Sequence, residues 1–389
     1  MSRSIAPRNA VARRHRLVSS PRTPPDSSVG AEKSARLLGF SLLELLIAAA
    51  LGVVLITAVV QLFAGSSRGN AALAGQALLQ ESARHAVALL SRSARNAGYH
   101  GCGGRDGLVN ALNGTWRRII EFDVSRPVEG FDGRGTNWIP DVGILPTTGG
   151  RALAFAGNRI DADELRADSD IVVFRRLEAS APPLARSLAT RLDPLTGQAE
   201  DPRVMVDDGL AFEADDFVVV SDCRQSALFR IGTIKTVGRV ATLSRPTASG
   251  PFGNRAGHSL SRDDEPYGGG VGPEGAGVRR VVTEIYFVAR GAGLNNRDET
   301  VWSLWRKTGA DRPAELVRGV DDLQVVFGVD LTPGDGVDGP NRYLPPGRLG
   351  ANPVRTVHFV VTVSSVDSVS ADDRILRRSF PWTVALRNG

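Results

Sequence analysis

The stretch Gly39-Phe40-Ser41-Leu42-Leu43-Glu44 opens a long apolar segment and decides the fold of the N-terminal part of this chain. The segment runs from Phe40 to Ala64, about 25 residues, which as a helix is long enough to cross roughly 30 Å of bilayer hydrocarbon. Its only polar side chains are those of Ser41, Glu44, Thr57 and Gln61. A carboxylate at the bilayer centre costs roughly 2.5–3.5 kcal/mol, so a lone acid in such a segment indicates a function.

The apolar segment continues into an amphipathic one without a helix breaker, because no proline occurs between Pro25 and Pro127. Within residues 76–96, apolar residues recur at steps of three and four: Leu79, Ala83, Ala86, Leu90 and Ala94. The pattern predicts one helix over 40–97, about 85 Å long. Its half 40–64 suits a membrane, and its second half suits the cover of a sheet. The glycines at 65, 69 and 75 predict a bend or a locally melted point, and Gly98 predicts the C-cap.

Residues 98–389 have the composition of a β-rich globular domain. Short runs of β-branched and aromatic residues predict strands at 170–176, 217–221, 227–231, 281–289, 301–307, 323–329, 356–364 and 380–386. A short helix is predicted at 161–167. The segments 103–150 and 245–278 are predicted to be long loops, since Gly and Pro are frequent there. The fold class is therefore α+β, with a long N-terminal helix packed on a mostly antiparallel β-sheet domain.

The positive charge of the chain is concentrated before the apolar segment. The whole chain carries +5, whereas residues 1–39 hold eight basic and two acidic residues, or +6. The remaining residues therefore carry about −1. Phosphate contacts require clustered Lys and Arg, so this distribution argues against nucleic acid as a partner, although Arg279-Arg280 forms a local basic patch. The basic segment instead favours a cytoplasmic N-terminus.

A basic leader, Gly39 before Phe40, Glu44 in the first helical turn and an unbroken apolar helix together resemble the class III signal of type IV pilins and type II secretion pseudopilins. The resemblance implies a fold like that of type IV pilins, and that a prepilin peptidase removes residues 1–39 by cutting after Gly39 and N-methylates Phe40. It also implies that Glu44 neutralises the N-terminal amine of a neighbouring subunit and sets axial register. Residues 40–64 would anchor the protein in the inner membrane, with residues 98–389 in the periplasm, until assembly. An uncleaved membrane anchor is the alternative.

Several blocks in the rest of the chain resemble the PilW family of minor pilins. They are residues 96–102, 216–223, 284–288, 303–307, 316–325 and 377–388, in that family's order. The resemblance implies a non-enzymatic minor pilin that primes type IV pilus assembly and lies near the pilus tip. Its implied partners are other minor pilins, the major pilin and a tip adhesin. The alternatives are a J-type pseudopilin of type II secretion, and a tip adhesin or DNA-uptake module that uses the long loops.

The chain has two cysteines, Cys102 and Cys223. In an exported domain, which meets an oxidising environment, two cysteines are expected to pair. The loop closed by this disulfide would be worth roughly 4–5 kcal/mol in the chain-entropy model. Two separate buried thiols are the alternative.

Catalytic and cofactor motifs find little support, so we predict neither enzymatic activity nor a cofactor. The five histidines are scattered, and Gly268–Gly275 lacks the lysine and helix of a phosphate-binding loop. One acidic turn suits calcium, with Asp330, Asp335 and Asp338 as ligands. Because Pro333-Gly334 stands where a further acid would help, a solvated turn is the favoured interpretation and no metal site is predicted.

Overall fold

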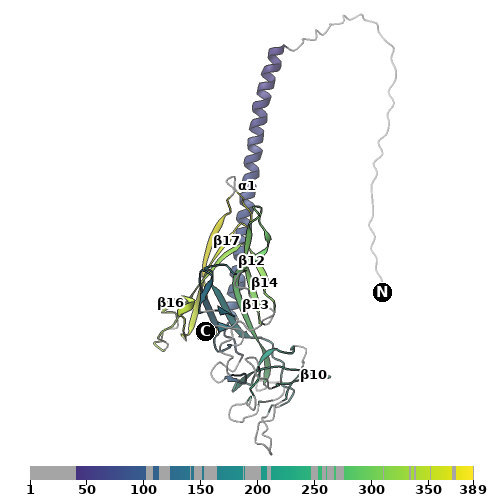
Figure 1. Cartoon of the computed structure of the whole chain (residues 1–389), viewed down its shortest axis with the longest axis vertical. Helices are drawn as coiled ribbons and strands as arrows, with labels where there is room; N and C mark the ends of the chain where they lie inside the picture. The colour runs from purple at the N-terminus through teal and green to yellow at the C-terminus, as the bar shows by residue number, and fades with distance from the viewer. Residues whose placement is uncertain are drawn as a thin grey trace, which may run out of the picture. The chain divides into compact units, whose positions relative to one another are not determined.

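The computed structural model describes residues 41–101, 108–113, 123–140, 142–143, 151–152, 164–186, 188, 203–207, 212–246, 253–255, 260, 267–268, 276–309, 311–332, 334–336, 339–350, 352–369 and 374–388. The chain divides into two compact units, residues 1–62 and residues 63–389. Helix α1 (Leu42–Asn96) is followed by strands only, apart from the short 3₁₀ helix η5 (Pro346–Arg348), in the described part of the chain (Figure 1). The predicted α+β fold is confirmed.

The strands have these bounds: β1 Leu108–Asn110, β2 Val128–Arg134, β3 Asn137–Ile139, β4 Val142–Gly143, β5 Arg151–Ala152, β6 Ile171–Leu177, β7 Val204–Asp207, β8 Phe217–Ser221, β9 Ser226–Arg230, β10 Ile234–Val237, β11 Val240–Leu243, β12 Gly277–Leu294, β13 Thr300–Thr308, β14 Ala314–Arg318, β15 Val320–Val329, β16 Arg342–Leu344, β17 Val354–Ser364 and β18 Arg377–Ala385. Each of the eight strands predicted from sequence overlaps one of these elements.

The second half of α1 buries the predicted apolar stripe. Leu79, Ala83, Ala86, Leu90 and Ala94 are each at most 4 % exposed. The helix is not interrupted at the three glycines expected to weaken it. Gly75 has a packing role instead, because a Cβ there would lie 2.6 Å from a methyl carbon of Val369. Gly98 has the positive φ of 77° expected of a C-cap glycine.

The largest sheet has the strand order β1-β9-β8-β12-β6-β2-β3, and β13 and β14 extend it from β12. All its pairs are antiparallel except β1 with β9. The long strand β12 organises this sheet, because its first residues pair with β8 and the following ones pair with β6 and β13.

A four-stranded antiparallel sheet, in the order β16-β15-β17-β18, shares one core with the largest sheet and α1. Strands β12, β13, β14 and β17 accompany the second half of the helix in Figure 1. Strands β10, β11 and β7 form a small third sheet next to a second hydrophobic cluster. The two-stranded β4–β5 pair is parallel.

The segment 103–150 differs from the predicted long loop, because it contains β1, β2, β3 and β4. Strand β2 pairs with β6 inside the largest sheet. At the end of the predicted helix 161–167, Leu165 forms a β-bridge with Ala289. Residues 161–163, and most of 245–278, lie outside the described residues.

Candidate functional site

The first turn of α1 holds the predicted assembly residue Glu44 in a capping box. The backbone N–H of Ser41 donates to Glu44 Oε2 at 3.0 Å, and the backbone N–H of Glu44 donates to Ser41 Oγ at 3.1 Å. This reciprocal pair satisfies two donors at the helix start, which matters in hydrocarbon, where an unsatisfied N–H costs several kcal/mol. Gly39 and Phe40, the predicted cleavage and methylation residues, lie outside the described residues.

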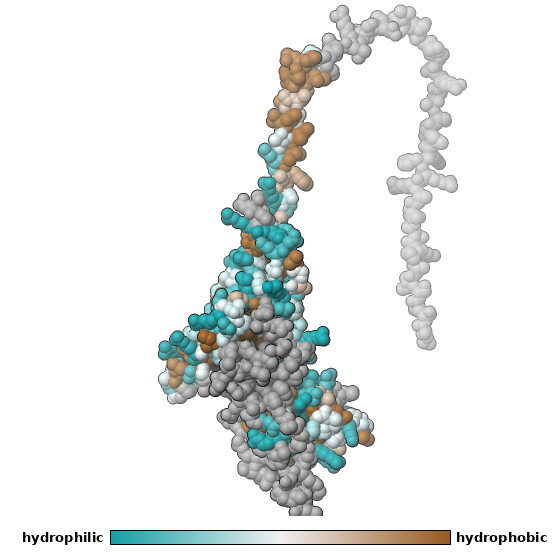
Figure 2. Space-filling model, viewed as in Figure 1, coloured by the Kyte–Doolittle hydropathy of each residue, from teal (hydrophilic) through white to brown (hydrophobic). Residues whose placement is uncertain are grey.

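The apolar half of α1 is exposed along its length. Leu42 and Phe63 are each 78 % exposed, and the large apolar side chains between them are also exposed. Figure 2 shows these side chains as a brown band on the helix. The helix is long and apolar enough to cross a membrane, which agrees with the predicted membrane segment.

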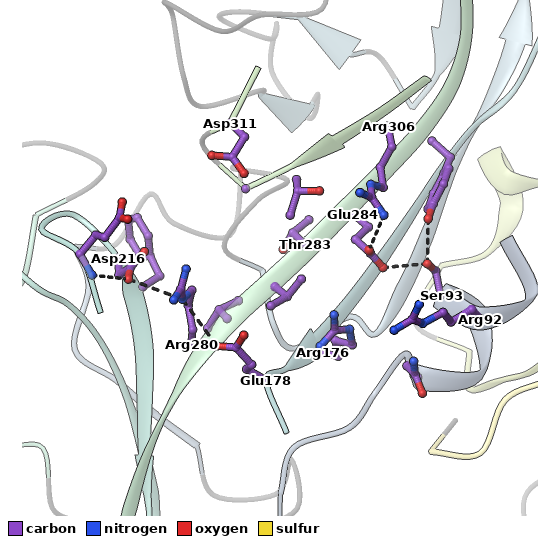
Figure 3. A pocket seen from close by; sticks show the side chains of 18 of the residues that line it. Arg92, Ser93, Arg176, Glu178, Asp216, Arg280, Thr283, Glu284, Arg306 and Asp311 are labelled. Carbon is purple, nitrogen blue, oxygen red and sulfur yellow. Dashed lines mark hydrogen bonds and ion pairs between the residues drawn. The ribbon is translucent and has the colours of Figure 1, made fainter. Parts of the chain in front are cut away.

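A polar cavity of about 490 Å³ lies where α1 ends on the largest sheet (Figure 3). Successive side chains of a strand point to opposite faces of the sheet, so every second residue of each strand lies on the face that α1 packs against. On the face covered by α1, Val172, Phe174 and Val288 belong to the hydrophobic core. Further along the same face the side chains are charged, and α1 no longer covers them because it ends at Asn96.

Paired charges form the floor of this cavity. The carboxylate of Glu284, only 8 % exposed, accepts a hydrogen bond from Ser93 Oγ at 2.7 Å and forms an ion pair with Arg306 at 3.4 Å. Arg280 lies 3.6 Å from both Glu178 and Asp216. Buried polar groups need such partners.

Asp216, which is half-buried, and Tyr286, which is buried, have shifted pKa values. Burial raises the pKa of Asp216, an effect that the backbone N–H of Glu213 and the charge of Arg280 oppose. Burial also raises the pKa of Tyr286, whose hydroxyl lies 2.9 Å from Ser93 Oγ. Both residues therefore favour their protonated forms more strongly than they would in water.

A second buried acid, Asp170, joins the two large sheets. Its carboxylate accepts backbone hydrogen bonds from Gly133 in β2, at 2.9 Å, and from Val325 in β15, at 2.8 Å. Its own N–H donates to the carbonyl of Leu323 at 2.8 Å. Burial raises the pKa of Asp170 to about 7, although the two backbone donors oppose the shift.

The remaining predicted residues are only partly described. Of the two cysteines predicted to pair, Cys223 is described but Cys102 lies outside the described residues, so their pairing stays a prediction. Asp330 is buried, and its carboxylate accepts from the Thr332 N–H at 3.0 Å and lies 3.6 Å from Arg355. Asp335 accepts from the Thr332 hydroxyl at 2.8 Å. Asp338 lies outside the described residues, and the described ones contain no group of three or more candidate metal ligands.

The core strands that hold α1 carry a match to a known protein family. Residues 285–365 match the PilW family, type IV pilus-assembly protein W. The match begins within β12 and ends just after β17, so it contains much of the core beneath the helix. It confirms the predicted resemblance to PilW and supports involvement in type IV pilus assembly. No curated protein and no solved structure matches the chain.

Sequence reasoning found Glu44 but missed the cavity. In the sequence, Arg280 stands out only as part of the basic pair Arg279-Arg280. The available signal was Glu284, an acid inside the otherwise apolar and β-branched strand pattern of 281–289. A charge there indicates either a solvated face or a buried ion pair, and the structure shows the latter.

Proposed function

We propose that this protein is a minor pilin that helps to initiate type IV pilus assembly and lies near the pilus tip. The observation that carries the proposal is the PilW match in the β domain, joined to a membrane-length helix whose first turn contains Glu44. The proposed role is structural and needs no catalysis. The proposed partners are other minor pilins, the major pilin and a tip adhesin.

The capping geometry supports a subunit contact for Glu44. Its Oε2 accepts the Ser41 N–H, while in the described part of the chain no hydrogen bond is recorded to Oε1. A carboxylate can accept through both oxygens, so Oε1 is open to the ammonium group that processing would create at Phe40 of a neighbouring subunit. Two charges that are each costly in lipid would then be paired across the contact.

Deletion of the gene followed by counting of surface pili tests the assembly role. We expect few or no pili while the major pilin is still processed. Normal pili in the deletion strain would refute the role in initiation. If secretion through a type II system fails instead, the J-type pseudopilin alternative gains support, and if adhesion or DNA uptake alone fails, a tip-binding module does.

Point variants test the proposed signal at finer resolution. Gly39→Ser is expected to block cleavage, seen as an unprocessed band on an immunoblot. Glu44→Ala is expected to be cleaved normally but to enter pili poorly. Gln61→Ala is the matched control, because it removes another polar group from the same apolar segment and is expected to assemble normally. Normal incorporation of Glu44→Ala would contradict the register role.

A further inference from the structure

The cavity at the end of α1 contains two arginines whose charges are not neutralised. Arg92, from the helix, is exposed, and Arg176, from β6, is half-buried. In the described part of the chain neither guanidinium has a recorded ion pair or hydrogen bond, and Arg176 Nε is buried without a partner. The two side chains lie at the same end of the cavity in Figure 3.

Carboxylates without ion-pair partners line another part of the cavity. Glu213 and Asp311 are exposed, and among the described residues no ion pair is recorded for either. Asp311 lies well away from Arg92 and Arg176 in Figure 3. The cavity therefore has a cationic end at Arg92 and Arg176 and an anionic end at Asp311, while the charges of Arg280–Glu178 and Glu284–Arg306 are already paired.

This charge distribution favours a polypeptide over a simple anion or a nucleic acid as the molecule that binds in the cavity. A simple anion would use only the arginine end, and the anionic end disfavours a nucleic acid. A polypeptide can present an acidic and a basic side chain a few residues apart, and so complement both ends. The open cavity of about 490 Å³ has room for several side chains.

We propose that this cavity binds a peptide segment of another pilus subunit, which places a carboxylate between Arg92 and Arg176 and a cationic side chain near Asp311. The identity of the partner as a pilus subunit rests on the proposed function. The contact would be separate from the pairing of Glu44, since it uses the β domain and the last turns of α1.

Site-specific photocrosslinking in piliated cells tests this contact on the full chain. A photoreactive amino acid replaces Asn96, an exposed residue that lines the cavity, and adducts are identified by mass spectrometry. We expect an adduct with an acidic segment of another pilus subunit. The double variant Arg92→Gln/Arg176→Gln is expected to lower its yield about ten-fold, in the range for loss of two charge contacts at an interface.

The matched control is Arg95→Gln. Arg95 is also exposed in the last turn of α1 but does not line the cavity, so this variant is expected to keep the adduct. Arg92→Gln alone, at an exposed site where folding is not at risk, is expected to lower the yield in the same direction. A charge swap completes the test: Arg176→Glu in this chain is combined with replacement of the crosslinked acidic residue of the partner by Arg. The swap is expected to restore the adduct yield.

Two results would overturn the inference: no subunit adduct from position 96 in piliated cells, or an adduct whose yield does not change in the double variant. Failure of the proposed function would look different, because the deletion strain would then keep normal pili. A chain that restores pili to that strain but gives no adduct would refute the cavity contact alone.

Discussion

Asp170 makes the stability of the β domain depend on pH in a direction opposite to that of most carboxylates. It is 2 % exposed, and burial raises its pKa from 3.8 to about 7. The folded state therefore holds its proton more tightly than the unfolded chain does. The stability contribution of Asp170 is greatest below about pH 4 and is lost as pH rises through about 7.

The size of the effect follows from the shift. A rise from 3.8 to about 7 corresponds to roughly 4 kcal/mol, at about 1.36 kcal/mol per pKa unit. Between pH 5 and pH 8 the linkage relation gives a loss of roughly 3 kcal/mol from this one group. Such a loss is a large fraction of the roughly 5–15 kcal/mol by which proteins are stable.

The test compares the wild-type protein with Asp170→Asn by chemical unfolding at several pH values, in detergent and followed by near-ultraviolet circular dichroism. Asn cannot titrate, but its amide would face one of the two backbone donors, at a cost of roughly 1–3 kcal/mol. We expect the difference in free energy of unfolding between the two proteins to change by roughly 3 kcal/mol between pH 5 and pH 8, because only the wild-type protein loses the contribution of Asp170.

Asp168→Asn is the matched control for this comparison. Asp168 is an exposed neighbour that accepts a backbone hydrogen bond from Gly135 at 2.6 Å. Its φ of 61° suits Asn as well as Asp. This variant is expected to follow the wild-type pH dependence. If the wild-type and Asp170→Asn curves run parallel from pH 5 to pH 8, the reasoning about Asp170 is refuted.

Two further predictions concern the attachment of α1. Leu90 is fully buried, so Leu90→Ala is expected to lower the free energy of unfolding by about 2–5 kcal/mol. Leu78 is 57 % exposed, so Leu78→Ala is expected to have little effect. Equal losses of the two variants in chemical unfolding would contradict this packing. Gly98→Ala would bring a Cβ into a clash with the carbonyl oxygen of Asn388. This variant is expected to lower the melting temperature more than Gly135→Ala does, because Gly135 has a similar φ of 60° but open space around it. Equal shifts in melting temperature would show that backbone strain alone matters.

The sequence predicted the elements whose signals are local. The apolar stripe of α1 and the β-branched runs of β8, β12 and β17 each carry a periodicity that a short window can show. Glu44 was found for the same reason, because one acid in an apolar segment is a local anomaly. The register of the strands and the joining of the two sheets have no such local signal.

Strand β2 shows why the rest was missed. Its sequence, Val-Glu-Gly-Phe-Asp-Gly-Arg, contains two glycines and three charges and does not resemble a strand. A Cβ at Gly130 would lie 2.6 Å from the ring of Phe327, and one at Gly133 would lie 2.6 Å from the carbonyl oxygen of Ser169. Both glycines permit close approach of distant segments. The cavity was missed for a related reason, since α1, β6, β12 and β13 meet there only in the folded chain.

The cavity exists because of the position that α1 takes on the sheets. Trp382 Nε1 of β18 donates to Ser91 Oγ at 3.1 Å, and Ser93 Oγ donates to Glu284 of β12 at 2.7 Å. Two residues of the helix therefore fix it to strands of both large sheets. A slide of one helical turn, about 5.4 Å, would break both hydrogen bonds and move Leu90 out of the core. Because such a slide is costly, the last turn of α1 ends at a fixed place on β12, and the helix leaves the charged sheet face beyond it uncovered.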